Sequence, residues 1–303
     1  MDNLKLGVKL SNMQIEKKLR RNNDDYKYSI IIPTWNNLAH LQLVIRSIKE
    51  NSTFQHQIII HINDGSDGTY DWVKQQEDLD YSYSEENIGV CYAMNIARSL
   101  ITTDYLVYIN DDMYVCPEWD LIFDQEITKI NSNSFFLSST LIEPIYTNNC
   151  TIVENFGTNL ATFREQDLLN SYQGLSKNDW SGATWPINII HVDNWDLVGG
   201  YSVEYFPGMY SDPDFSKKLW DIGIRYFKGL GKSRAYHFVS LSTTRTKHNN
   251  GRRSFLLKWG VTSKTFTNLY LKRGSDFSGD LKEPLLSFYD KFINKVKFIL
   301  NSI

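Results

Sequence analysis

Short apolar runs alternate with helical patterns along the first part of the chain. β-branched residues fill the run 28–33, which ends in a proline, and the next segment, 38–51, places apolar residues three and four positions apart. A second buried run at 57–62 is followed by a Gly- and Asp-rich turn and a short helical pattern. A helical pattern over 87–100 then precedes a third apolar run, 105–110. The pattern predicts three strands joined by helices.

The predicted strands are apolar at nearly every position, which is typical of parallel strands buried on both faces and connected by helices. We therefore predict an α/β fold with an open, Rossmann-like mixed sheet flanked by helices. Each strand ends in a polar cluster, PTWNN, NDGSDGT or NDDM. Because ligands of open α/β sheets bind at the carboxyl ends of the strands, three such clusters at one edge predict a binding site. Ordinary capping is the alternative for each cluster taken singly.

The second half of the chain is less regular. Its clearest helical pattern is DPDFSKKLWDIG, which begins at Asp212. Near the C-terminus, apolar residues again recur at helical spacing, with lysines among them. This second helix is predicted either to lie on an anionic membrane surface or to pack on its own domain or a partner subunit. Its apolar residues are Leu285, Tyr289, Phe292, Val296 and Ile299, and its lysines are Lys291, Lys295 and Lys297.

Composition excludes several classes of protein. With 42% hydrophobic and 22% charged residues, the 303-residue chain is typical of a globular protein, and its formal charge of −3 argues against nucleic acid as the main ligand. No apolar run reaches the ~18–20 residues of a membrane span, and the N-terminus lacks a signal-peptide core. Cys91, Cys116 and Cys150 have no CxxC spacing, which argues against a disulfide framework or zinc site and favours a cytoplasmic protein.

The polar end of the third predicted strand carries two adjacent carboxylates, Asp111 and Asp112. Carboxylate oxygens are hard ligands that suit Mg²⁺ or Mn²⁺, and such ions often complete their coordination with phosphate oxygens of a substrate. The pair therefore indicates a cation site for a phosphorylated ligand. A solvated turn with an Asp cap remains the alternative when this motif is taken alone.

Six segments taken in order resemble family 2 of the nucleotide-sugar glycosyltransferases, which have the GT-A fold. They are SIIIPTWNN, IIIHINDGSDGT, ENIGVCYAMNIA, YLVYINDDM, VGGYSVEYFPGMYSDPDFSKKLWDIG and HFVSLST. The resemblance covers most of the chain. It implies an N-terminal extension at 1–27, a GT-A domain at 28–260 with a nucleotide-binding half at 28–115 and an acceptor-binding half at 116–260, and a C-terminal helical extension at 261–303.

The resemblance implies donor-binding roles at the three strand ends. Asp64 would accept a hydrogen bond from the pyrimidine ring, Asp111 would contact the ribose, and Asp112 would hold the metal on the diphosphate. Asn110 stands where the family often has Asp, which still leaves two adjacent carboxylates. The other residues implied in nucleotide binding are Pro33, Thr34, Trp35, Asn87 and Gly89.

The resemblance also implies the chemistry on the acceptor side. In SDPDF, Ser211 replaces the usual Glu, Asp212 matches the catalytic base and Asp214 is the second candidate. A base is needed because a protonated hydroxyl is a poor nucleophile, although Asp212 is also a candidate helix cap. His237 stands where many members have a third metal ligand, with a purely structural histidine as the alternative. Acceptor binding is implied for Trp180, Trp185, Gly199, Gly200 and Tyr201, and closure over the diphosphate for Lys247, His248, Arg252 and Arg253.

The combined prediction is a metal-dependent, inverting glycosyltransferase that uses Mn²⁺ or Mg²⁺. It would move a hexosyl or N-acetylhexosaminyl group from a nucleotide-diphosphate donor, with UDP preferred, to a hydroxyl in surface polysaccharide or glycolipid synthesis; an oligomer is possible. A sugar-1-phosphate nucleotidyltransferase is less favoured because PTWNN has no Gly-rich phosphate loop. A catalytically silent sugar-binding relative is the other alternative. The segment GLGKS is not a P-loop, because Tyr226 stands where that motif requires Gly.

Overall fold

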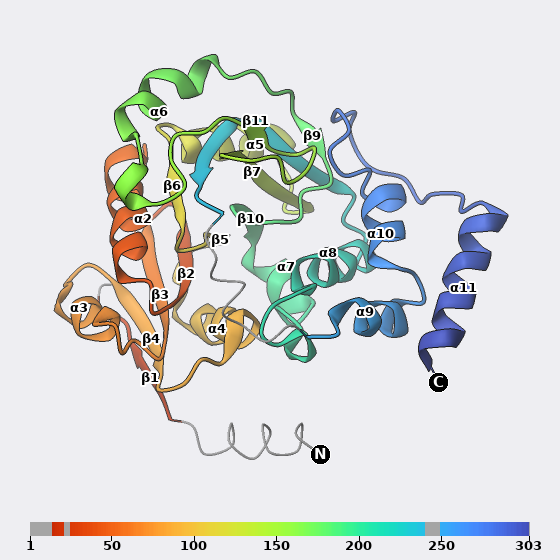
Figure 1. Ribbon diagram of the computed structural model, residues 1–303, viewed down its shortest axis with the longest axis horizontal. Helices are drawn as coiled ribbons and strands as arrows, with labels where there is room; N and C mark the ends of the chain where they lie inside the picture. The colour runs from red at the N-terminus through yellow and green to blue at the C-terminus, as the bar shows by residue number, and fades with distance from the viewer. Residues whose placement is uncertain (1–13, 21–24, 240–248, 303) are drawn as a thin grey trace.

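The computed structural model describes residues 14–20, 25–239 and 249–302, and its centre is one large mixed sheet with helices on both faces (Figure 1). The first strands are β2 (Ser29–Trp35), β3 (Gln57–Asn63), β4 (Asp80–Ser84) and β5 (Tyr105–Tyr108), connected by helices α2 (Leu38–Asn51), α3 (Thr69–Gln75) and α4 (Gly89–Ala97). These strands are parallel and lie in the order β4-β3-β2-β5. The predicted α/β fold with an open sheet is confirmed.

The second part of the sheet brings in antiparallel pairs. Its strands are β6 (Met113–Val115), β7 (Phe135–Glu143), β8 (Ile152–Val153), β9 (Trp180–Ser181), β10 (Asn188–His191) and β11 (Tyr226–His237). β10 is antiparallel to both β5 and β7, β11 is parallel to β7, and β6 is antiparallel to β11 at the edge. One continuous sheet therefore joins residues from both predicted halves of the domain.

Most of the remaining helices surround this second part of the sheet. They are α5 (Trp119–Ile130), α6 (Glu165–Ser171), α7 (Val192–Leu197), α8 (Ser211–Asp221), α9 (Gly251–Trp259), α10 (Ser263–Thr265) and α11 (Phe288–Ser302). 3-10 turns occur at Arg98–Leu100, Leu160–Thr162, Tyr172–Gly174 and Val203–Tyr205, and a π-helical turn at Phe266–Tyr270. The predicted helices at DPDFSKKLWDIG and near the C-terminus correspond to α8 and α11. No helix in the described part of the chain is both long and apolar enough to cross a bilayer.

Consecutive residues of β2 pack into two different hydrophobic cores. Ile30 and Ile32 lie in the core that α2 and α5 cover, whereas Ile31 lies in the core that α4 and α8 cover. Successive side chains of a strand point to opposite faces of the sheet. A strand with both faces covered buries side chains on both sides, and apolar side chains need no hydrogen-bond partner there, which explains the apolar runs in the sequence.

Two strands of the sheet lack a clear signal in the sequence. β4 reads DYSYS and is buried although every second residue is polar. Its Asp80 accepts a hydrogen bond from the Gln57 amide at 2.7 Å, and the Ser82 hydroxyl lies 2.8 Å from Nδ1 of His61. β1 (Ile15–Lys18) pairs antiparallel with β4, inside the segment predicted as an N-terminal extension. The run 105–110 is therefore not the third strand, and β5 itself ends at Tyr108.

Pro33 does not end the first predicted strand, because β2 continues to Trp35. The carbonyl oxygen of Ile31 accepts from the backbone N–H of Ile109, so this side of β2 faces β5. Pro33 lies two residues further on, on the same side, where the pairing with β5 has already stopped at Ile31. A proline is tolerated there because no ladder hydrogen bond requires its missing N–H.

Candidate active site

The carboxyl ends of β2 and β5, the end of β11 and the start of α8 border a cleft of about 370 Å³. Most of the residues predicted for donor binding, metal binding and catalysis line it. They are Pro33, Thr34, Trp35, Asn87, Gly89, Asp111, Asp112, Asp212 and His237. Segments far apart in the sequence thus meet at the edge of the sheet where α/β folds bind their ligands.

Asp111 and Asp112 lie in the turn that joins β5 to β6. The Thr34 hydroxyl, at the end of β2, donates a hydrogen bond to Oδ2 of Asp111 at 2.7 Å. Asp112 is only 5% exposed, and its backbone carbonyl accepts from the N–H of Phe238, directly after β11. The two carboxylates are therefore held by neighbouring strands, which a solvated surface turn would not require.

His237, the last residue of β11, lies between two carboxylates. Its Nε2 is 3.5 Å from Oδ1 of Asp112, and its Nδ1 is 2.8 Å from Oε1 of Glu143, the last residue of β7. Burial alone would lower the pKa of His237, but Asp112 and then Glu143 outweigh burial and raise this pKa to about 10. The imidazole is therefore charged at neutral pH when no other cation is present.

Glu143 was not among the residues suggested by the sequence, although it ends an apolar strand in the same way as the Asp pair. Its Oε1 contacts Nδ1 of His237, and its Oε2 accepts a hydrogen bond from the hydroxyl of Thr147. Both oxygens are engaged, and the side chain is buried. Glu143 therefore fixes the ring so that Nε2 points toward Asp112, the arrangement in which carboxylates orient metal-binding histidines.

Asp112 and His237 together offer donors suited to Mn²⁺ or Mg²⁺. A carboxylate oxygen and an imidazole nitrogen from adjacent strands approach each other inside the cleft. Within residues 14–20, 25–239 and 249–302, no group of three or more His, Cys, Asp or Glu side chains is arranged to hold a metal ion. A cation at this place would need further oxygens from a ligand such as a diphosphate, which is how Mg²⁺ and Mn²⁺ are commonly held.

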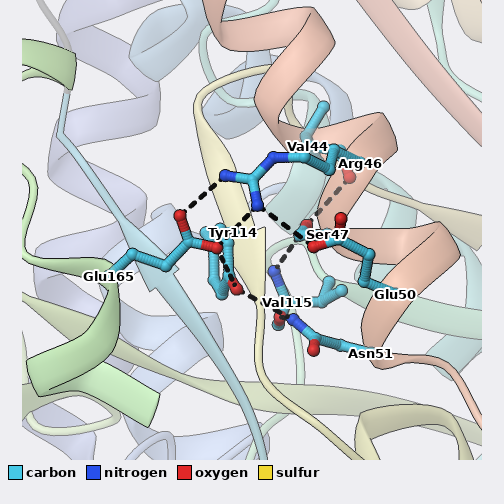
Figure 2. Close-up of polar contacts among 8 residues, drawn as sticks. All are labelled: Val44, Arg46, Ser47, Glu50, Asn51, Tyr114, Val115 and Glu165. Atoms are coloured by element: carbon cyan, nitrogen blue, oxygen red, sulfur yellow. Dashed lines mark hydrogen bonds and ion pairs between the residues drawn. The ribbon is translucent and has the colours of Figure 1, made fainter.

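A polar network holds β6, which begins immediately after Asp112, against α2 (Figure 2). Arg46 of α2 makes two hydrogen bonds, of 2.8 and 2.7 Å, to the carboxylate of Glu165. The Tyr114 hydroxyl donates to Glu165 at 2.8 Å and accepts from Asn51 at 3.1 Å. Asn51 also donates to the carbonyl of Val115 at 2.8 Å. These bonds fix the short strand that follows the turn with Asp111 and Asp112.

Asp212 lies in the first turn of α8 and faces the cleft. Oδ1 of Asp212 accepts a hydrogen bond from the Tyr201 hydroxyl at 2.9 Å. Burial raises the pKa of Asp212 to about 7, and the bond from Tyr201 acts in the opposite direction. Tyr210, in the left-handed conformation, is the N-cap residue of α8, and no side chain caps this end. Asp212 therefore does not serve as the helix cap.

Asp214, the second candidate base, points into the protein and is fully buried. Its carboxylate accepts hydrogen bonds from the Ser202 hydroxyl at 2.6 Å and the Trp259 indole N–H at 2.8 Å. Lys258 completes the set with an ion pair at 2.9 Å. These contacts join α8 to α9, and Asp214 is not part of the cleft lining.

Asp64 lies just beyond β3, next to the cleft rather than in its lining. Its Oδ2 accepts from the Asn36 amide at 2.8 Å and its Oδ1 from the backbone N–H of Ser66 at 3.2 Å. Burial opposes ionisation, but the hydrogen bonds from Ser66 and Asn36 outweigh it and lower the pKa of Asp64. The residue is therefore a fixed carboxylate at the rim, and Asn63 takes the place in the lining.

The turn at Asn87 and Gly89 is held tightly against the opposite wall. The Asn87 side chain accepts from the N–H of Gly89 at 2.9 Å, and Asn63 accepts from the N–H of Ile88 at 2.9 Å. Gly89 has a φ of 73°, and a Cβ there would lie 2.7 Å from the carbonyl oxygen of Pro207. Only glycine fits both the conformation and the space.

None of the five residues predicted to bind the acceptor is part of the cleft lining. Trp180 is buried over Gly229 and donates from its indole N–H to the Thr140 hydroxyl at 2.9 Å. Trp185 stacks beneath the guanidinium of Arg273, 4.1 Å from the ring centroid. Gly199 and Gly200 form the left-handed turn after α7, and Tyr201 reaches the site through Asp212. Trp180 is thus packed in the core, whereas Trp185 is half-buried beside Arg273.

Residues Pro207, Gly208 and Met209 line the cleft on this side but were not singled out from the sequence. The sequence could have pointed to them, because they belong to the segment YFPGMY, which ends two residues before the predicted base Asp212. In the basic stretch, Lys247 and His248 lie outside the described residues. Arg253 of α9 donates to the backbone carbonyl of Asn301 in α11 at 2.8 Å.

Comparison with known proteins agrees with this geometry. Residues 29–136 match the family model described as glycosyl transferase family 2. No curated protein matches the sequence. Among solved structures, residues 1–349 of TarS from S. aureus align with a TM-score of 0.55 and 13% identity over 91% of this chain and 71% of that one. The same fragment in complex with UDP-GlcNAc gives 0.53 and 12%, over 91% and 72% of the two chains.

GalNAc-T7, in a crystal with UDP, GalNAc and Mn²⁺, aligns with a TM-score of 0.56 and 12% identity. The alignment covers 84% of this chain and 53% of GalNAc-T7, so the chain spans about half of that protein. At such low identity these likenesses show the fold, and the family model shows the family over the segment it matches. Residues 29–136 therefore match glycosyl transferase family 2, within a chain that has the fold of the GT-A glycosyltransferases.

Proposed function

We propose that this protein is a metal-dependent, inverting glycosyltransferase that moves a sugar from a UDP-sugar to an acceptor hydroxyl in surface polysaccharide or glycolipid synthesis. One observation carries the proposal: Asp112 and His237 share one cleft with Asp212. Asp112 and His237 offer ligands for a cation bound to a diphosphate. Asp212 offers a carboxylate to the incoming acceptor hydroxyl. Direct displacement with inversion needs these two devices and no protein nucleophile.

Asp112 and His237 would hold Mn²⁺ or Mg²⁺, whose charge would favour departure of the diphosphate. Asp111, fixed by Thr34, is placed to accept from a ribose hydroxyl. Pro33, Trp35, Asn87 and Gly89 line the part of the cleft that we assign to the base and the phosphates, and Asp64 lies at its rim. UDP is the preferred nucleotide because the similar structures of TarS and GalNAc-T7 contain UDP or UDP-GlcNAc. This likeness also favours a hexosyl or N-acetylhexosaminyl group.

Asp212 would take the proton of the acceptor hydroxyl as the glycosidic bond forms. A pKa of about 7 suits this role, because a general base works best when its pKa is near the working pH. The Tyr201 hydroxyl holds the carboxylate in place by its 2.9 Å bond, so we assign Tyr201 a positioning role. The backbone of Pro207, Gly208 and Met209 forms the adjacent wall, where we place the acceptor.

These assignments give each part of the chain its own function. We infer that 28–115 binds the donor and 116–260 the acceptor, while 261–303 supports the second part. Three buried free thiols, Cys91, Cys116 and Cys150, fit a reducing, cytoplasmic location. A catalytically silent relative is the second candidate, since the same cleft would bind a nucleotide-sugar without transferring it.

The test is turnover of UDP-sugars by the purified protein. UDP-Glc, UDP-Gal, UDP-GlcNAc and UDP-GalNAc would each be offered with a panel of glycoside acceptors, with and without Mn²⁺, and released UDP would be measured. We expect release from one donor that requires Mn²⁺ and is lost in Asp112→Asn. Binding of a donor without release under any condition would identify a silent relative and refute the transferase.

A further inference from the structure

Helix α11 lies at the edge of the molecule beside α9 and α10 (Figure 1) and turns a polar side toward its own domain. Asn294 is the buried residue of this helix. Its Oδ1 accepts from the backbone N–H of Thr262 at 3.0 Å and from the Thr265 hydroxyl at 3.1 Å. One residue before the helix ends, the carbonyl of Asn301 accepts from Arg253. The hydrogen bonds that attach the helix to its domain run through amides and carbonyls, and Ile293 and Val296 are the half-buried apolar residues of the helix.

The opposite side of α11 is apolar and exposed. Phe288 is 86% exposed, Phe292 54% and Ile299 50%. At roughly 100° per residue, these three fall within about 40° of one another around the helix, and Asn294 lies on the far side. Tyr289 and Leu300 widen the stripe and are also exposed. The amphipathic helix is thus inverted relative to its own domain, since a helix that belonged to the core would bury this side.

Exposure of large apolar side chains is concentrated in this one place. Seven of the 15 exposed large hydrophobic residues in the described part of the chain fall between Leu285 and Leu300. Scattered exposed hydrophobics are normal, but a contiguous patch marks an interaction surface. The partner must therefore offer an apolar surface to this helix.

Charge identifies the kind of partner. Lys291 and Lys295 lie along one margin of the apolar stripe, Lys297 lies beyond the other, and all three are exposed. Asp290, the acidic residue of α11, lies on the side that faces the domain and accepts from the Ser287 hydroxyl. An apolar face bordered by lysines is complementary to the surface of an anionic bilayer. Two copies of the helix packed face to face would instead bring lysines near lysines.

We propose that α11 binds the surface of an anionic membrane, with Phe288, Phe292 and Ile299 inserted among the acyl chains and the lysines at the phosphates. The helix lies in the interface plane and does not cross the bilayer. This inference does not depend on glycosyl transfer, and it would place the catalytic domain beside any lipid-linked acceptor. It assigns the C-terminal extension a docking role of its own.

The test is sedimentation of the full chain with vesicles of phosphatidylcholine containing phosphatidylglycerol, and with vesicles of phosphatidylcholine alone. We expect binding to the anionic vesicles that weakens as salt is raised. Phe292→Ser with Ile299→Ser should abolish it. Lys291, Lys295 and Lys297 changed together to Gln should weaken it on the order of 100-fold, because each lysine near an anionic surface contributes about fivefold. Every altered side chain is exposed, so folding is preserved.

Leu197→Ser is the matched control, because Leu197 is another exposed apolar residue, 70% exposed, and lies on α7 rather than α11. It should bind vesicles as the unaltered chain does. Equal binding to neutral vesicles, or no loss in the Phe292 and Ile299 variant, would overturn the proposal. A dimer in solution that this variant converts to monomer, together with no vesicle binding, would show that the face belongs to a second copy of the chain.

Discussion

Replacement of Asp212 by Asn should remove the acceptor-activating base while leaving the site intact. Asn has nearly the same shape, and its amide oxygen can still accept the hydrogen bond that Tyr201 donates to Oδ1 of Asp212. The loss of general base catalysis is expected to lower kcat/KM by about 10²–10⁴. This corresponds to about 3–5 kcal/mol of transition-state stabilisation, at 1.36 kcal/mol per factor of ten. Donor binding should change little, since we assign Asp212 to the acceptor side of the cleft.

The pH dependence of kcat/KM is a second, independent test of the role of Asp212. Because burial raises the pKa of Asp212 to about 7, the carboxyl is protonated and inactive below that pH. The logarithm of kcat/KM should therefore rise with a slope of one up to about pH 7 and then level off. Asp212→Asn should lack this limb. Tyr201→Phe removes the bond that lowers the pKa, so its limb should move to higher pH.

The same shift predicts an effect on stability with a definite sign. The folded pKa of Asp212 lies above its ordinary value of 3.8, so ionisation is harder in the folded protein. The contribution of protonated Asp212 to the free energy of unfolding is fully present below about pH 3.8 and is lost as the pH rises through 7. The shift of about three pH units sets an upper limit of ~4 kcal/mol, which water in the cleft reduces. Asp212→Asn should therefore be more stable than the unaltered protein at pH 8, and the gain should shrink toward pH 4.

Two assays check these expectations: UDP release between pH 5 and 9 at saturating Mn²⁺, and urea unfolding at pH 4, 6 and 8. Asp214→Asn serves as the comparison, since Asp214 lies in a buried network with Ser202, Lys258 and Trp259. It should cost stability at every pH and leave the pH limb in place. If Asp212→Asn keeps more than a tenth of the activity and the rise of kcat/KM with pH is unchanged, Asp212 is not the general base.

Three further changes follow from contacts around the cleft. Glu143→Gln should weaken Mn²⁺ binding 10- to 100-fold by titration calorimetry, because Glu143 orients His237; unchanged affinity would mean that Glu143 is only structural. Arg46→Met should lower the free energy of unfolding by about 1 kcal/mol at pH 7. Arg46 lowers the pKa of Glu165 below 4.5, so this loss is present above pH 4.5 and should diminish in urea melts as the pH falls below that value. Gly89→Ala should destabilise far more than Gly199→Ala in thermal melts; both glycines have positive φ, but no atom lies within 4 Å of a Cβ at 199. Equal losses would contradict the steric argument.

The strands that build the donor side could be predicted because they are buried on both faces. Runs such as Ile30–Ile32 in β2 and Ile58–Ile60 in β3 are apolar on both faces of the sheet, and this pattern can be seen directly in the sequence. β4 escaped prediction because its burial depends on partners: Asp80 needs Gln57, and Ser82 needs His61. Such cross-strand hydrogen bonds replace the apolar signal and cannot be seen from one strand alone.

The site was predictable where one residue type marks one role, and less so where roles depend on distant segments. Asp111 and Asp112 stand out as carboxylates at a strand end. Glu143 ends another strand in the same way, but nothing local links it to His237, which is 94 residues away. Asp212 and Asp214 are separated by one residue in a helix and therefore point in different directions, and only packing shows which one faces the cleft.

The orientation of α11 is likewise a tertiary property. Its apolar and polar sides are evident in the sequence, but the sequence pattern alone is equally consistent with an apolar side that packs on the domain or on a partner and with one that faces a membrane. The hydrogen bonds of Asn294 to Thr262 and Thr265 decide the opposite orientation.

The most direct test of the donor site is calorimetric titration of the protein with UDP, GDP and dTDP, each with and without Mn²⁺, and of Asp112→Ala under the same conditions. We expect UDP to bind more tightly than GDP and dTDP. Its binding should depend on Mn²⁺, and Asp112→Ala should abolish that dependence. Binding of no nucleotide, or UDP binding that is indifferent to both Mn²⁺ and Asp112, would contradict the assignment of this cleft as a metal-dependent donor site.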